Sequence, residues 1–157
     1  MIRPGDVQLM SAGRGVAHSE FNHSADQPVH FLQIWIVPSM LGAEPRYQQR
    51  HFAPYEKRGR LRLIISPDGA EDSLQIRQNA RVYAGLFDGD ESASFRVEEG
   101  RYAYVHVARG ELELDGRTLK EGDGVRIREA GELAFAHGKD AEVLVFDLRP
   151  LESPQMP

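Results

Sequence analysis

Glu111-Leu112-Glu113-Leu114-Asp115-Gly116 is the stretch that decides the fold class of this chain. Its leucines alternate with acidic residues, as they do along a strand that has one face in a core and the other in water. Asp115-Gly116 is one of the strongest short signals for a β-hairpin turn. The segment therefore predicts two adjacent antiparallel strands, with Leu112 and Leu114 pointing inward.

The same pattern of short strands extends in both directions from this hairpin. Runs of β-type residues are separated by Gly, Pro and Asp at intervals of roughly 8 to 12 residues, which is typical of sandwiches and barrels. No segment has a sustained helical period. We therefore expect an all-β fold, with strands at 61–65, 75–86, 93–97, 102–107, 111–115, 125–127 and 142–148, and turns at Ser66–Gly69, Asp88-Gly89, Arg109-Gly110 and Gly122–Gly124.

The first 52 residues are less regular. Val29–Val37 is apolar on both faces, which predicts a strand sandwiched inside a β structure. Glu44–Phe52 is polar and poor in β-branched residues, so it reads as a connecting segment. At the other end of the chain, residues 150–157 read as a frayed tail.

Composition limits the class of protein. The 157 residues are 41% hydrophobic, enough for one or two compact units with a core. A net charge of -5 argues against binding to nucleic acids or anionic membranes, which favour a positive face. With no cysteines, thiolate metal sites and cysteine nucleophiles are excluded. No signal peptide or membrane-spanning run is visible, so we expect a cytoplasmic protein.

The candidate site lies in residues 4–20. They read as a strand, a turn punctuated by Gly13 and Gly15, and a second strand that ends in His18-Ser19-Glu20. Residues two apart share one face of a strand, so His18 and Glu20 can supply an imidazole and a carboxylate to one metal ion. A stable metal site generally needs at least three protein ligands, and this pair alone would bind weakly.

The remaining histidines are weaker candidates. His23 lies close to the pair in sequence and can curl back toward it. His30 falls in the predicted 29–37 strand, where a core histidine bonded to backbone is the simpler interpretation. Of the others, His51 reads as a surface residue, His106 as a packing or hydrogen-bonding residue and His137 as a turn residue.

The 4–20 stretch resembles the signature of the pirin family, in the pattern Pro-Gly-Asp-Val-Gln-x-Met-x-Ala-Gly-x-Gly-x-x-His-Ser-Glu. The likeness continues through residues 32–36, 45–49, 82–85, 110–112 and 142–148. Pirins are two-domain cupins built from tandem jelly-roll β-barrels. The resemblance implies part of an N-terminal cupin plus connector at 1–52, a complete C-terminal cupin at 53–150, and a tail at 151–157.

The resemblance also implies a metal and an activity. The N-terminal cupin of pirins holds one ion, usually iron, through three histidines and a glutamate, and bacterial members act as quercetin 2,3-dioxygenases. His18 matches the third histidine. Glu20 matches the glutamate, a metal ligand that also acts in catalysis by accepting the flavonol hydroxyl proton. The first two histidines belong to a His-x-His motif, which this sequence lacks. The chain thus resembles a pirin that starts halfway through its first cupin.

Three functions follow as hypotheses. The first is quercetin 2,3-dioxygenase ancestry, with a site for Fe(II) or another divalent metal that is incomplete and weak or inactive in a monomer. The second is a non-enzymatic pirin-like protein that binds a partner, and the third is a small-ligand module in the C-terminal barrel. A half barrel exposes strand edges and apolar surface, so we expect self-association as a dimer. A symmetric dimer would bring two His18/Glu20 pairs together.

Overall fold

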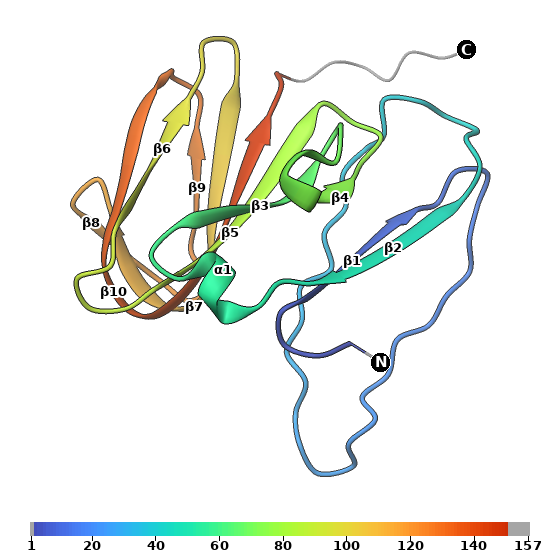
Figure 1. The fold of residues 1–157 in the computed structure, drawn as a ribbon, viewed down its shortest axis with the longest axis horizontal. Helices are drawn as coiled ribbons and strands as arrows, with labels where there is room; N and C mark the ends of the chain where they lie inside the picture. Colours follow the sequence, from blue (N-terminus) through green and yellow to red (C-terminus); the bar gives the residue numbers. More distant parts are fainter. Residues whose placement is uncertain (1, 151–157) are drawn as a thin grey trace.

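The computed structural model describes residues 2–150 and contains two β-sheets (Figure 1). The small sheet pairs β1 (Asp6–Ser11) with β2 (Arg46–His51). The large sheet holds β3 (Leu61–Ser66), β4 (Leu74–Gln75), β5 (Ala80–Phe87), β6 (Ala93–Val97), β7 (Tyr102–Leu114), β8 (Arg117–Lys120), β9 (Gly124–Ile127) and β10 (Gly131–Leu148). Two single turns of helix, α1 (Pro54–Lys57) and the 3₁₀ turn η1 (Ala70–Asp72), complete the elements. The all-β prediction is confirmed.

The two longest strands, β7 and β10, organise the large sheet. They pair with each other along their length, and each takes different neighbours at its two ends. β10 pairs with β6 over residues 131–135 and with β5 over 141–148. β7 pairs with β9 over 103–106 and with β8 over 111–114. Strands that change partners midway belong to both layers of a folded sheet, which is how a jelly-roll cupin is built.

A bulge inside β7 replaces the turn that we expected at Arg109-Gly110. Gly110 lies within the strand, with a φ of +68°. A Cβ at this position would lie 2.3 Å from the backbone oxygen of Lys139 on β10. Only glycine permits this approach, which accompanies register shifts between the two strands. The prediction was wrong because glycine marks a bulge as readily as a turn.

The main core lies between the layers of the large sheet. Leu112 and Leu114 are 0% and 5% exposed, which confirms the predicted inward face of this strand. The Asp115-Gly116 turn is also confirmed, with φ of +50° and +74° and a β7–β8 hairpin around it. The interior is filled by apolar side chains, most of them fully buried: Phe87, Val97, Ala103, Val105, Val107, Leu112, Leu114, Leu133, Phe135, Ala141, Val143 and Val145.

A second apolar cluster explains why apolar and polar residues do not alternate along the central strands β5 and β10. The opposite face of β5 and β10 carries Val82, Ala84 and Phe146, which pack with Phe52 and with residues of β3. Val7 and Leu9 of β1, and Ile36, pack against this cluster, so the N-terminal part of the chain rests on the large sheet. Strands that are buried on both faces read as continuous apolar runs.

The N-terminal predictions need three corrections. Val29–Val37 is not a strand, because its backbone pairs with no other strand of the described residues. Glu44–Phe52 is not simply a connector, since β2 runs through it. The predicted second strand of the 4–20 motif is also irregular, although its first strand is β1.

Elsewhere the predicted strands are present. The 75–86 segment divides into β4 and β5, and the 142–148 strand is the C-terminal part of β10. The predicted tail lies outside the described residues apart from Pro150, and the domain boundary between residues 52 and 53 stays a prediction. None of the helices in residues 2–150 is long and apolar enough to cross a membrane.

Candidate metal centre

The His18-Ser19-Glu20 motif lies in a long excursion between β1 and β2. Residues 12–45 form no helix or strand (Figure 1). Nearly all of their side chains are exposed. The excursion leaves β1 through the predicted turn, which is confirmed by a hydrogen bond from Gly15 N to Ala12 O of 2.8 Å. A Cβ on Gly13 would lie 2.0 Å from Ala43 O, so this glycine allows the two ends of the excursion to pass closely.

His18 and Glu20 are both exposed side chains on irregular backbone. Neither makes a hydrogen bond or ion pair with another residue in the described part of the chain. The prediction that they share one face depended on a strand, and the structure has none there. Nothing in residues 2–150 therefore fixes the imidazole and the carboxylate relative to each other.

The other histidines are dispersed over the molecule. His23 is exposed on the same excursion. His30 is exposed too, and faces Arg109, whose Nε lies 3.4 Å from His30 Nδ1, so its predicted core position is wrong. His106 stacks on Tyr104 with 6.4 Å between ring centroids, in keeping with a packing role. His137 has a φ of +52° at the bulge of β10.

The donor set does not complete a metal site within the described residues. No group of three or more His, Cys, Asp or Glu side chains in residues 2–150 is placed to hold a metal ion. A neutral imidazole and a carboxylate are suitable ligands for Fe(II) or Ni(II), but a stable site for such ions needs more than two. Within residues 2–150, His18 and Glu20 are therefore two candidate ligands that no third candidate ligand accompanies.

His51 has a partner that the sequence did not predict. Its Nδ1 lies 2.8 Å from Asp6 Oδ1, across the β1–β2 pair. The backbone N–H of Arg3, and then His51, hold the pKa of Asp6 below its ordinary value. The side chain of His51 is 53% exposed, which agrees with the predicted surface position. Predicting this pair requires the recognition that residues 46–51 form a strand. Their polar composition indicated a connecting segment instead.

The interior of the C-terminal cupin is predominantly apolar. It is lined by the buried apolar side chains of the main core. Among the described residues, no buried side-chain nitrogen or oxygen lacks a hydrogen-bond partner. Ligand pockets usually combine apolar walls with a few polar groups that point inward. This packing argues against the third hypothesis, a small-molecule site inside that barrel.

Comparisons with known proteins agree with the fold and with the motif. Residues 1–36 match the family model of pirins, and residues 63–148 match that of the quercetinase C-terminal cupin domain. The quercetin 2,3-dioxygenase of Escherichia coli K12 is 34% identical over 150 residues, which cover 96% of this chain and 64% of that protein. The chain thus spans about two thirds of this relative's length.

Solved structures give the same result. The Escherichia coli pirin YhhW in complex with nickel(II) is 35% identical with a TM-score of 0.85, covering 94% of this chain and 62% of that one. GK1651 from Geobacillus kaustophilus, at 20% identity and a TM-score of 0.74, covers 98% of this chain and 67% of its own and shares the fold. With a two-part sequence match, a 4–20 motif and a jelly-roll sheet in agreement, the chain belongs to the pirin family of cupins.

Proposed function

We propose that this pirin-like cupin of quercetinase ancestry is weak or inactive as a flavonol dioxygenase when it acts as a single chain. The observation that carries the proposal is the position of His18 and Glu20, exposed on irregular backbone with no third ligand grouped with them in residues 2–150. One E. coli relative is a quercetin 2,3-dioxygenase, and the E. coli pirin YhhW was solved in complex with nickel(II). Both support a divalent metal in this family. Fe(II) is the ion that we propose for this chain.

Metal retention and quercetin turnover test the proposal together. The purified chain is incubated with Fe(II) or Ni(II) and desalted, its metal content is measured, and quercetin consumption is followed by absorbance. We expect far less than one ion per chain and no turnover above that of the free metal. Stoichiometric metal that is lost in His18→Ala and Glu20→Ala, but kept in the control His23→Ala, would overturn the proposal.

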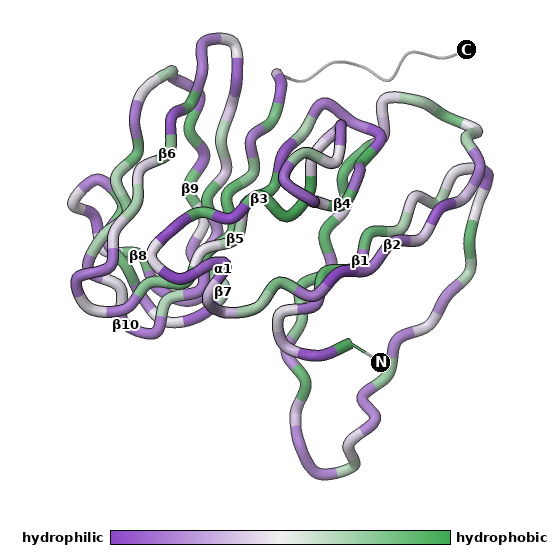
Figure 2. The backbone as a smooth tube through the Cα atoms, in the orientation of Figure 1, coloured by the Kyte–Doolittle hydropathy of each residue, from purple (hydrophilic) through white to green (hydrophobic). Residues whose placement is uncertain are grey.

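A non-enzymatic role as a partner-binding protein is the second candidate, and exposed apolar side chains favour it. Phe21 and Trp35 are 83% and 88% exposed, and hydrophobic residues recur along the excursion between β1 and β2 (Figure 2). Monomeric proteins rarely leave so much apolar surface in water. We propose a second copy of this chain as the partner, because in residues 2–150 β1 and β2 pair only with each other and leave edges that another copy can extend.

Light scattering during gel filtration tests the second candidate. We expect the mass of a dimer, and we expect Trp35→Glu to shift it toward the monomer, because burying the new carboxylate would be costly. Tyr55→Glu serves as the control, since Tyr55 is also exposed, at 78%, but lies on α1 outside the excursion. A wild-type chain that elutes as a monomer at all concentrations contradicts self-association.

A further inference from the structure

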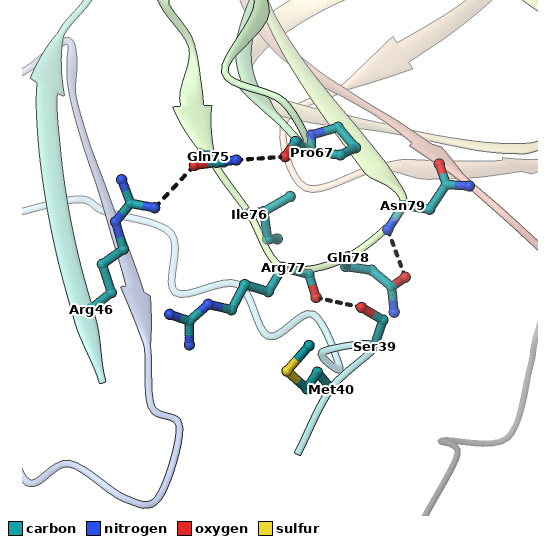
Figure 3. A pocket seen from close by; sticks show the side chains of 9 residues that line it. All are labelled: Ser39, Met40, Arg46, Pro67, Gln75, Ile76, Arg77, Gln78 and Asn79. Atoms are coloured by element: carbon teal, nitrogen blue, oxygen red, sulfur yellow. Dashed lines mark hydrogen bonds between the residues drawn. The ribbon is translucent and has the colours of Figure 1, made fainter. Parts of the chain in front are cut away.

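A cavity of about 380 Å³ lies between the start of β2 and the turn that joins β4 to β5 (Figure 3). Arg46 and Arg77 supply its charged side chains, and Met40, Pro67 and Ile76 supply apolar wall. No Asp or Glu side chain is among the residues that line it. This volume lies within the range of small-molecule sites.

Both arginines are held in place by neutral partners. Arg46 Nη1 donates to Gln75 Oε1 at 3.0 Å, and Gln75 Nε2 in turn donates to Pro67 O at 3.1 Å (Figure 3). Arg77 Nη1 donates to the backbone oxygen of Glu44 at 2.7 Å. A guanidinium has five N–H donors in a fixed fork, so each arginine keeps donors for a ligand after these bonds are made.

Neither arginine of the cavity forms an ion pair with a described carboxylate. The nearest candidate by sequence, the Glu44 side chain, pairs with Arg14 instead. The chain as a whole carries a net charge of -5. Because Arg46 and Arg77 have no carboxylate partner there, the cavity is positively charged although the protein is acidic. Arginine forks bind carboxylates in a bidentate manner, and such charge-assisted bonds are stronger than neutral ones.

We propose that this cavity binds a small organic carboxylate. The carboxylate accepts hydrogen bonds from the free donors of Arg46 and Arg77, and the apolar part of the ligand packs on Met40 and Ile76. The polar neighbours fix both guanidinium groups before the ligand arrives, which lowers the entropy cost of binding. The site uses neither His18 nor Glu20, so it is independent of the function proposed above.

Two-dimensional NMR of the full chain with benzoate as the probe tests the site. Benzoate titration should shift the backbone amides of residues 75–79 and the Nε–Hε signals of Arg46 and Arg77, with a single saturating curve. Benzyl alcohol, which has the ring without the charge, should bind at least about tenfold more weakly, as expected when charge-assisted hydrogen bonds are lost. Inorganic phosphate, which has charge without an apolar part, should also bind more weakly than benzoate.

Substitutions of individual arginines distinguish a specific binding site from a general effect of positive charge. Arg46→Gln and Arg77→Gln should each weaken benzoate binding about tenfold, and Arg77→Lys should weaken it too, because lysine keeps the charge and loses the fork. Arg96→Gln is the matched control, since Arg96 is an exposed arginine that pairs with Glu98 on another part of the surface. Amide spectra away from the cavity report whether each variant is folded.

The outcomes are distinct. Benzoate binding that depends on both arginines and is unchanged in the Arg96 variant supports the proposal. It is overturned if benzoate shifts no signal of residues 75–79, if benzyl alcohol or phosphate binds as tightly, or if the arginine variants bind as wild type does. Should one glutamine variant fail to fold, Arg77→Lys and the other variant still decide the matter.

Discussion

Replacing Gly110 by alanine should destabilise the C-terminal cupin far more than the same change at Gly116. Both residues have a left-handed φ, +68° and +74°, so alanine costs about 1–2 kcal/mol of backbone strain at either position. At Gly116 the new methyl group meets nothing within 4 Å. At Gly110 it would lie 2.3 and 2.4 Å from the backbone oxygens of Lys139 and Asp140, atoms that cannot move without separating β7 from β10. Such overpacking adds about 1–3 kcal/mol.

Equilibrium urea unfolding followed by far-UV circular dichroism measures this difference. Fluorescence is unsuitable, because the single tryptophan, Trp35, is 88% exposed and lies outside the large sheet. Gly131→Ala is a third variant, with an ordinary φ and no neighbour within 4 Å, and it should change the free energy of unfolding by less than about 0.5 kcal/mol. If Gly110→Ala and Gly116→Ala lose the same stability, within about 0.5 kcal/mol at equal m values, the packing argument for the bulge is refuted.

Three further predictions concern the rest of the fold. Leu112→Ala, at a side chain with 0% exposure, should cost about 2–5 kcal/mol in the same urea assay, and a loss below 1 kcal/mol would mean that this core is loosely packed. Arg101→Met should cost about 2 kcal/mol, because Arg101 Nε lies 2.7 Å from Asp147 Oδ1 with both side chains 15% exposed; a neutral result would show that the pair contributes nothing. In the folded chain the pKa of Asp6 is lowered, first by the hydrogen bond from the backbone N–H of Arg3 and then by His51. The ionised carboxylate therefore stabilises β1–β2 at pH values above about 4, the pKa of an unfolded aspartate, and this stabilisation is lost as the pH falls through the lowered pKa of the folded state. Hydrogen exchange of the β1 amides should therefore be faster in Asp6→Asn than in wild type at pH 6, and a difference that persists after carboxylate protonation at pH 2 would contradict this reading.

The sequence predicted those elements whose local pattern and tertiary setting agree. Leu112 and Leu114 alternate with acidic residues, and the sheet buries only one side of that strand end, so the period-2 pattern was sufficient. The Arg109-Gly110 turn failed because the local signal of glycine is the same for a turn and a bulge, and the difference lies in the approach of β10. β2 was missed since its polar residues 46–51 pair with β1 across a long excursion rather than across a short turn.

For the candidate site, the sequence predicted the family but not the positions of the side chains. The motif at residues 4–20 identified the family correctly, because a signature is a property of sequence. The geometry of His18 and Glu20 is a property of strand pairing, and an isolated strand is not stable in water without neighbours. In the described chain the apolar run at 29–37 finds no partner strand, and only Ile36 from it packs on the second cluster. The family was therefore predictable from sequence, whereas the placement of the His18 and Glu20 side chains was not.

If a second copy supplies the missing neighbours, metal binding and self-association must be linked. A symmetric pair of His18/Glu20 motifs offers four ligands, and a metal that binds the dimer better than the monomer stabilises the dimer by mass action. The apparent affinity for Ni(II) should then rise with the concentration of the chain, and Ni(II) should increase the mass measured by light scattering. His18→Ala should abolish the effect of the metal on mass and leave the metal-free mass unchanged. If the affinity for Ni(II) is independent of chain concentration over about a hundredfold range, no site is shared between copies, and each His18/Glu20 pair acts only within its own chain.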